Sequence, residues 1–299
     1  MSKLLARKTP AAFKTLPLYV EATADGLSYR GLGLPLNFAQ MLERRSPVQV
    51  EDGQRFALEL ANLGVSVRLT LTWQGREYWV LVRQRRPDRG DTVLKLISGY
   101  VPVHELNLPL LTAIAEVAEE CLVEDERGWL AGRYADTWLP TPYALPYREN
   151  TPFRLSPLSG AARPVQCGNQ MLLERPRAYV HLPTASLQLV YDLRLELPRD
   201  CRQPSLFHVD EHLEHGELVA RLERRRPDLY LLPLKAGLPG SELFTLRRGE
   251  LVAASTRGLW LSESFASQDG WLVRDERIRW KDWQARLRGE AGEPGRRAG

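Results

Sequence analysis

A pair of long strand-like segments joined by a glycine-containing turn constrains this chain most strongly. Residues 65–73 (VSVRLTLTW) alternate apolar and polar side chains, and residues 77–83 (EYWVLVR) are rich in aromatic and β-branched types. Gln74 and Gly75 lie between them, and glycine suits a tight hairpin turn. Because successive side chains of a strand point to opposite sides, this pattern predicts two antiparallel strands with a buried face.

The rest of the chain adds strands and a smaller number of helices. Two more hairpins are expected at residues 18–30 and 243–254, and single strands at residues 177–182 and 187–197. Helical periodicity marks four segments, which are 37–45, 108–123, 209–226 and 280–288. Hairpins with helices between them predict an α+β fold rather than a doubly wound sheet.

Composition and proline content indicate how the chain is divided. With 43% hydrophobic and 26% charged residues, the chain has the balance of a globular protein, and 299 residues allow two modest domains or one enlarged core. Six prolines between residues 138 and 164 predict a long loop or linker. The predicted parts are a hairpin and helix addition (1–54), the first part of the core (55–137), a proline-rich loop or linker (138–175), the remainder of the core with C-terminal elements (176–288) and a disordered tail (289–299).

Cysteine usage and the lack of long apolar runs bear on location. Cys121, Cys167 and Cys201 are far apart and form no C-x-x-C pair, so neither a disulfide framework nor a thiolate zinc site is expected. The first residues lack the apolar region of a secretory signal, and no run approaches the roughly 20 apolar residues of a membrane span. We therefore expect a cytoplasmic protein without a membrane partner.

The clearest helix, over residues 108–123, carries an acidic face. At about 100° per residue, Glu116, Glu119, Glu120 and Glu124 fall opposite the apolar arc, and the helix contains no Lys or Arg. One interpretation is a solvated face of an amphipathic helix. The other follows from the repulsion between like charges one turn apart, which a divalent cation would relieve. Mg²⁺ and Mn²⁺ prefer carboxylate oxygens, so the spacing also suits a metal site.

The residues around this helix resemble the sequence box of the Nudix hydrolase superfamily. The matching segments are Gly99-Tyr-Val-Pro-Val-His-Glu105 and Ala115-Glu-Val-Ala-Glu-Glu-Cys-Leu-Val123. The family pattern is a glycine, five residues, a glutamate, seven residues, then Arg-Glu-aliphatic-x-Glu-Glu-x-Gly-aliphatic. The resemblance is close over residues 65–125, and it implies a mixed β-sheet sandwiched by helices, with extra N-terminal and C-terminal elements.

The resemblance also implies an activity and a site. The activity is hydrolysis of a nucleoside diphosphate linked to another group, with Mg²⁺ or Mn²⁺ as cofactor. The implied metal-binding positions are Glu105, Glu116, Glu119 and Glu120. In the same comparison, Glu120 is the first candidate for the base that activates water and Glu119 is the second.

Residues upstream of the box are candidates for substrate binding. Arg83, Arg85, Arg86 and Arg89 form a basic cluster whose guanidinium groups match phosphate oxygens bidentately. Gly99 begins the box, and Tyr100 is a candidate for stacking on a base. The alternative for the arginines is a solvated strand end.

Departures from the family pattern keep other functions open. Nine residues rather than seven separate Glu105 from Ala115, alanine replaces the arginine at 115, and Leu122 replaces the closing glycine. A non-catalytic ligand-binding or regulatory module of the same fold is therefore the alternative to an enzyme.

Two further segments suggest other partners. The net charge of +4 comes from the second half, where the run 274–288 mixes aromatic and basic residues, so a nucleic-acid-associated adaptor is a weaker alternative. A surface helix that packs two tryptophans inward is the other interpretation of that run. His208-Val-Asp-Glu211-His212 matches H-x-x-E-H, a zinc-protease order, at the start of the predicted helix 209–226.

Overall fold

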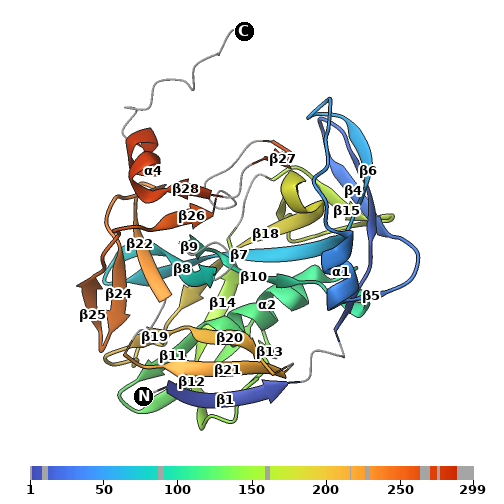
Figure 1. The fold of residues 1–299 in the computed structure, drawn as a ribbon. Coiled ribbons are helices and arrows are strands. Elements are labelled where there is room, and N and C mark those ends of the chain that lie inside the picture. Colours follow the sequence, from blue (N-terminus) through green and yellow to red (C-terminus); the bar gives the residue numbers. More distant parts are fainter. Residues whose placement is uncertain are drawn as a thin grey trace.

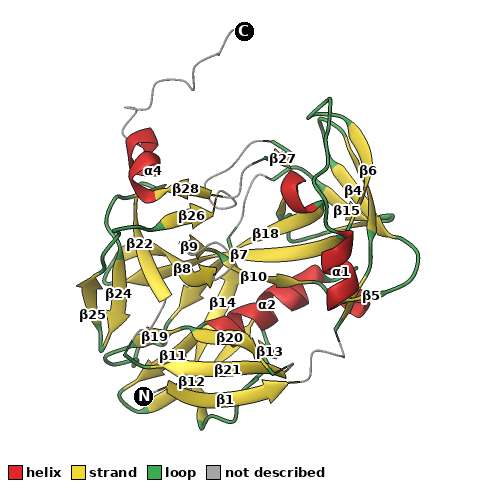
Figure 2. Ribbon diagram, in the orientation of Figure 1, coloured by secondary structure: helices red, strands yellow, loops and turns green. Residues whose placement is uncertain are grey.

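The structure is a computed structural model that describes residues 2–8, 13–86, 91–158, 162–215, 217–225, 229–262, 270–274 and 277–287. Its architecture is dominated by mixed β-sheet with few helices, as Figures 1 and 2 show. This agrees with the predicted mixture of strands and helices at the level of an α+β or mostly β class. No helix among the described residues is long and apolar enough to cross a membrane.

The predicted central hairpin forms the middle of the largest sheet. Strand β7 (Asn62–Trp73) pairs antiparallel with β8 (Arg76–Arg86), and the turn contains Gly75 at a φ of +74°. Strand β18 (Ser186–Glu196) runs parallel to β7 along its other edge. The apolar side chains at alternate positions of β7, from Leu63 to Leu71, are fully buried in the main core. The apolar positions of the alternation are therefore the buried ones.

Helix α2 (Pro109–Glu120) packs on that buried face. Ala113 and Val117 of the helix join the same core cluster as the inward side chains of β7. Strand β10 (Ile97–Tyr100) pairs with the first half of β7 and lies beside the helix. The helix is shorter than predicted, because the chain enters strand β11 (Leu122–Asp125) directly after Cys121.

The N-terminal part forms a small sheet with its own helix. The predicted hairpin of residues 18–30 is present as β3 (Leu18–Ala22) and β4 (Leu27–Gly31). Strands β6 (Phe56–Leu60), β15 (Val165–Cys167) and β16 (Gln170–Met171) complete its order β16-β15-β4-β3-β6. A two-stranded pair, β2 (Lys14–Thr15) and β5 (Leu36–Asn37), leads into helix α1 (Phe38–Arg44). Asn37 and Gln40 form a capping box, which explains the start of the predicted helix 37–45.

The interpretation of residues 138–164 as a loop is wrong for much of this stretch. Strand β14 (Tyr147–Pro157) pairs with β12 (Gly128–Tyr134) on one side and with β18 on the other. Pro152 lies at the register irregularity of the β12 pairing and Pro157 is the last residue of the strand, which are positions where a missing backbone N–H is tolerated.

The remaining elements extend the large sheet. They are β9 (Asp91–Lys95), β13 (Thr137–Trp138), β17 (Arg177–His181), β19 (Ser205–Phe207), β22 (Leu229–Lys235), β23 (Leu238–Pro239), β24 (Phe244–Arg247), β25 (Glu250–Ala253), β26 (Trp260–Ser262), β27 (Leu272–Val273) and β28 (Arg277–Arg279), with 3-10 turns η2 (Val103–Glu105) and η3 (Leu182–Thr184). The hairpin β24–β25 was predicted. Helix α4 (Trp280–Leu287) buries Trp280 and Trp283, as the inward-packing interpretation expected. The predicted tail 289–299 lies outside the described residues.

The predicted helix 209–226 is wrong, because the segment forms a hairpin. Strands β20 (Val209–Glu214) and β21 (Glu217–Glu223) pair antiparallel, and β1 (Ser2–Lys8) adds to β21 as a third strand. His215 adopts a φ of +51° at the turn, which an α-helix does not allow. Val209 and Leu222, directly opposite each other, are buried with Ala220 in one cluster, so the segment follows the two-residue period of a strand.

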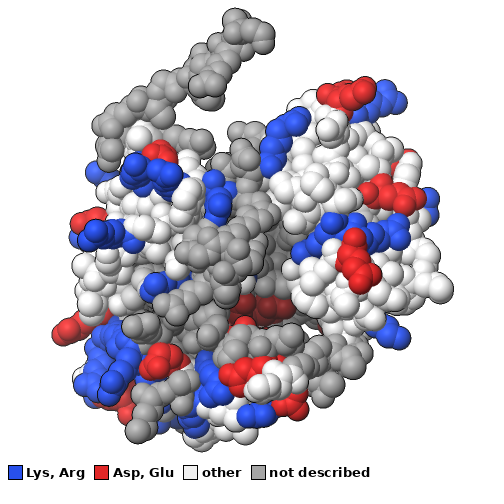
Figure 3. All heavy atoms as spheres, in the orientation of Figure 1, with Lys and Arg blue, Asp and Glu red and all other residues white. Residues whose placement is uncertain are grey.

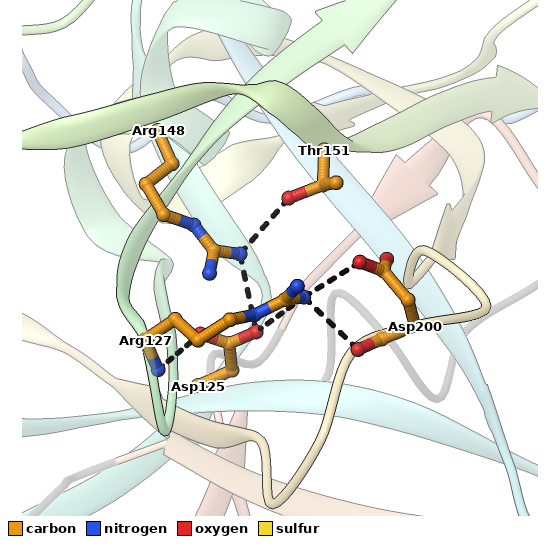
Figure 4. A network of polar contacts seen from close by, with 5 residues as sticks. All are labelled: Asp125, Arg127, Arg148, Thr151 and Asp200. Carbon is orange, nitrogen blue, oxygen red and sulfur yellow. Dashed lines mark hydrogen bonds and ion pairs between the residues drawn. The ribbon is translucent and has the colours of Figure 1, made fainter.

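A buried polar network joins the β11–β12 turn, strand β14 and the segment around Asp200 (Figure 4). The carboxylate of Asp125 has no exposed surface, and it accepts hydrogen bonds from Arg148 Nη2 at 3.1 Å and from the backbone N–H of Arg127 at 2.8 Å. Arg127 also lies 2.8 Å from the carboxylate of Asp200, and Arg148 donates to the Thr151 hydroxyl at 2.9 Å. The network therefore holds the β11–β12 turn against β14 and the segment around Asp200.

Strand β1 offers a test of the three-stranded sheet. Leu5 packs against the cluster that contains Trp129 and Leu222, whereas the neighbouring Leu4 is 43% exposed. We expect Leu5→Asp to lower the free energy of unfolding by about 2 kcal/mol, because it places a charge against apolar neighbours. Leu4→Asp is the matched control and should change it by less than about 0.5 kcal/mol. Urea unfolding measures both, and equal effects would show that β1 does not dock as described.

Candidate acidic site

Three glutamates of α2 lie on the side of the helix that is not embedded in the core. Glu116, Glu119 and Glu120 are all intermediate in exposure, while Val117 and Ala118 between them are buried. Figure 3 shows acidic side chains at the floor of a hollow near the middle of this face, between the positions of α2 and β20 in Figure 1. The three glutamates are therefore less exposed than the solvated face of a simple amphipathic helix would be.

Gly99 allows the first glutamate to approach strand β10. A Cβ atom added at residue 99 would lie 1.7 Å from Glu116 Oε1 and 2.1 Å from its carboxyl carbon, so no residue with a side chain fits without displacing Glu116. The backbone conformation of Gly99 is that of an ordinary strand residue paired with Val65. Glycine at this position thus leaves room for the Glu116 carboxylate, which a larger residue would push aside.

Glu120 lies against the next residue of the same strand. Its carboxylate accepts a hydrogen bond from the backbone N–H of Ser98, and its Oε2 atom is buried without any hydrogen-bond partner. A buried carboxylate oxygen without a partner is costly, because it has lost its hydration. This orphaned oxygen is the feature of the cluster that best fits a cation or a hydrogen-bond donor.

A fourth carboxylate reaches the site from β20. Glu211 is opposite Ala220 in the β20–β21 hairpin, so the two-residue period places it on the same face as the buried Val209. The Tyr143 hydroxyl lies 3.4 Å from Glu211 Oε1 and donates to the backbone carbonyl of Glu119 at 3.1 Å. Tyr143 therefore links the end of α2 to the strand that carries Glu211.

Burial and mutual repulsion change the protonation of these groups. Burial first, and then the charges of Glu120 and Glu119, raise the pKa of Glu116 from its ordinary value of 4.5 to about 8. Burial is also the main cause that raises the pKa of Glu120, and Glu211 and Glu119 act in the same direction. Burial, with the nearby charge of Lys95, lowers the pKa of His208 to about 3. The site thus combines carboxyl groups that hold protons unusually tightly with a neutral imidazole.

The raised pKa of Glu116 predicts a pH-dependent stability. The folded state holds the proton more tightly than the unfolded state, so the free energy of unfolding should fall as pH rises from about 4.5 to about 8. The slope has an upper limit of about 1.4 kcal/mol per pH unit for one group. Glu116→Gln should flatten this decline, whereas Glu149→Gln at an exposed position should leave it unchanged. Thermal unfolding at several pH values would contradict the assignment if both variants followed the wild type.

The residues fit a divalent cation in chemistry but do not form a finished site. Within the described part of the chain, no three His, Cys, Asp or Glu side chains stand together as a group that could hold a metal ion. The donors that are present are carboxylates, which hard ions such as Mg²⁺ and Mn²⁺ prefer, and one of their oxygens is buried without a partner. The cluster therefore suits a hard cation, provided that the carboxylates turn toward it.

Glu105 is placed differently from the other predicted metal ligands. Its Oε2 accepts a hydrogen bond from the hydroxyl of Thr112, and its Oε1 lies 3.8 Å from His104 Nε2. Thr112 is one helical turn before Glu116, so Glu105 ties η2 to the first half of α2. Its role as a metal ligand stays a prediction.

The predicted substrate-binding residues are only partly described. Arg83 on β8 donates to the Tyr230 hydroxyl at 3.3 Å. The side chains of Arg85 and Arg86, and the whole of Arg89, lie outside the described residues. Phosphate binding by this loop therefore stays a prediction.

Tyr100 takes part in contacts that join α1 to β10. The Arg45 guanidinium lies 4.8 Å from the Tyr100 ring centroid and donates to its hydroxyl at 3.2 Å. The Phe38 ring centroid is 5.9 Å away, and Arg45 also donates to the side chain of the buried Asn62. The ring thus helps to hold the N-terminal helix, and its stacking on a base stays a prediction.

Sequence reasoning missed Lys95 and Tyr143 and gave Glu211 and His208 the wrong context. The H-x-x-E-H pattern requires a helix, but the segment is a strand, and the side chain of His212 lies outside the described residues. The signal for Lys95 was available, because it is the one charged residue in the apolar run 93–97. Tyr143 belongs to the proline-rich stretch, where no periodicity marks it.

Comparisons with known proteins leave the family open. A scan against models of protein families gives no match, and a search of curated proteins gives none either.

Proposed function

We propose that this protein is a Nudix-type pyrophosphohydrolase that acts on a nucleoside diphosphate linked to another group. The observation that carries the proposal is the buried, unpartnered carboxylate oxygen of Glu120, one helical turn after the Glu116 carboxylate that lies against Gly99. Glu211 of β20 is close enough for its charge to raise the pKa of both. These acids come from two separate segments of the chain. A merely solvated helix face would leave them apart and hydrated.

The surroundings of α2 support the same proposal. The box helix packs against a mixed sheet in which β7 pairs parallel with β18 and antiparallel with β8 and β10. The glycine of the box is close to the first glutamate of the helix, which gives a physical reason for both residues at that spacing. A Nudix-like core, with added N-terminal and C-terminal elements, is therefore part of the proposal.

The proposed mechanism assigns roles to this chain's own side chains. Glu116, Glu119 and Glu120 would hold Mg²⁺ or Mn²⁺, which neutralises phosphate charge and acidifies bound water. Glu120 Oε2, which is buried without a partner, would accept the proton of the attacking water. Tyr143 would hold Glu211 in place, and neutral His208 would donate or accept a hydrogen bond without adding charge.

A substrate panel tests this proposal. Purified protein is assayed with nucleoside diphosphate sugars, dinucleoside polyphosphates and nucleoside triphosphates, with Mg²⁺ or Mn²⁺ present and after chelation. We expect metal-dependent release of a nucleoside monophosphate from at least one class. Turnover that survives Glu119→Gln and Glu120→Gln would overturn the site assignment.

A ligand-binding module is the second candidate, and the replacement of the family's arginine and glycine by Ala115 and Leu122 favours it. This candidate predicts that the same panel gives no turnover, while a nucleotide raises the melting temperature by mass action. A nucleic-acid adaptor is disfavoured by the burial of Trp280 and Trp283, because these rings are not presented for stacking on bases.

A further inference from the structure

Lys95 places a positive charge on the same side of the sheet as the glutamate cluster. In the pairing of β9 with β8, Lys95 is directly opposite Val82, whose side chain is buried in the core cluster that includes Val117 of α2. Directly opposite residues of an antiparallel pair share a face of the sheet. The lysine side chain therefore leaves the sheet on the side of α2.

Ser98 connects this lysine to the glutamates. Lys95 Nζ donates to the Ser98 hydroxyl at 3.0 Å, and the backbone N–H of Ser98 binds the Glu120 carboxylate. The next residue, Gly99, lies against the carboxylate of Glu116. Two adjacent residues of β10 thus bring one ammonium group and two carboxylates together.

The charges around the ammonium group agree with this geometry. Lys95 lowers the pKa of Glu116, of Glu120 and of His208. Its charge therefore acts on two carboxyl groups of α2 and on the histidine just before β20. Helix α2 itself has no Lys or Arg, and residue 115, where the Nudix box has arginine, is alanine. The positive charge near these carboxylates therefore comes from Lys95 of β9 and not from the helix itself.

We infer that Lys95 is a resident cation of the glutamate cluster, which competes with a divalent metal for the same carboxylates and sets the metal concentration at which the site fills. The inference rests on the metal site of the proposed function. It assigns Lys95 a positioning role, since the ammonium acts through the carboxylates. When a divalent ion enters, the ammonium keeps its hydrogen bond to the Ser98 hydroxyl and repels the ion from that position.

Isothermal titration with Mg²⁺ alone, on the full chain, tests this role without any turnover. Lys95→Met keeps the length of the side chain but removes the charge, and Lys95→Arg keeps the charge. Lys95→Gln keeps a donor for Ser98 and replaces the methionine variant if that variant fails to fold. Lys235→Met, at an exposed position on β22, is the matched control. A titration at pH 8.5 reduces competition from protons on Glu116.

We expect Lys95→Met to bind Mg²⁺ about tenfold or more tightly than the wild type, because the repulsion between the ammonium and the metal is removed. Lys95→Arg and Lys235→Met should bind within about twofold of the wild type. Unchanged or weaker binding by both neutral variants would overturn the inference, even if the wild type hydrolyses its substrates. Binding that appears only in the neutral variants would support the inference and count against a metal-dependent wild-type enzyme.

Discussion

Glu120→Gln is expected to lower the turnover number of phosphoanhydride hydrolysis by at least about a hundredfold, the usual contribution of a general base. The substitution keeps the shape of the side chain, and the amide oxygen can still accept the hydrogen bond from Ser98 N–H. It removes the unpartnered carboxylate oxygen that would take the proton from water. Initial rates at saturating substrate and saturating Mg²⁺ measure the effect.

Glu124→Gln is the matched control for this experiment. Glu124 was expected on the acidic arc of the helix, but it belongs to β11 and its carboxylate binds Arg224 at 2.6 and 3.1 Å. The control should retain turnover within about twofold, because Glu124 lies outside the glutamate cluster. Loss of its ion pair with Arg224 should also change stability little, since surface ion pairs contribute little to it. A loss of activity in Glu124→Gln equal to that in Glu120→Gln would contradict a special role for Glu120.

Asp125→Asn is expected to lower the free energy of unfolding by about 3 kcal/mol, the usual effect of removing one partner from a buried ion pair. Asp125 is fully buried and Arg148 is only 18% exposed, so the charge of Arg148 would stay largely buried without its partner. Arg127 is less affected, because it is 41% exposed and keeps Asp200. Urea unfolding, followed by circular dichroism, measures the change.

Asp136→Asn is the control for the charge change itself. Asp136 is fully exposed and lies 3.9 Å from Arg133, so its removal should change stability by less than about 0.5 kcal/mol. If Asp125→Asn were as mild as this control, the network of Figure 4 would contribute nothing beyond surface charge.

Local patterns predicted the elements whose signal lies within a few neighbouring residues. The hairpins around Gly75 and Gly249, the helix capped by Asn37 and the helix after Pro109 all have such signals, and all are present. The segment after Val209 failed because its charged residues also fit one face of a helix. The structure of this segment depends on pairing with a strand that is distant in the sequence, because β1 adds to β21.

The site was predictable only where it lies within one helix. Glu116, Glu119 and Glu120 share α2, so their spacing alone put them together. Glu211 and Lys95 come from strands whose register is set by pairing with Ala220 and Val82. No short-range sequence pattern predicts that register, because the register depends on which strands pair with each other. The metal and the phosphate-binding arginines stay predictions.

The pairing of β1 with β21 sets an order in which the protein can be completed during synthesis. The chain emerges from the ribosome N-terminal end first, and contacts between distant residues form late. Ser2 pairs with Glu223, so this strand remains an unpaired edge until residue 223 has been translated. Unpaired edges attract other strands. The edge of β1 is therefore open to pairing with other strands until the hairpin that carries Glu211 has been synthesised.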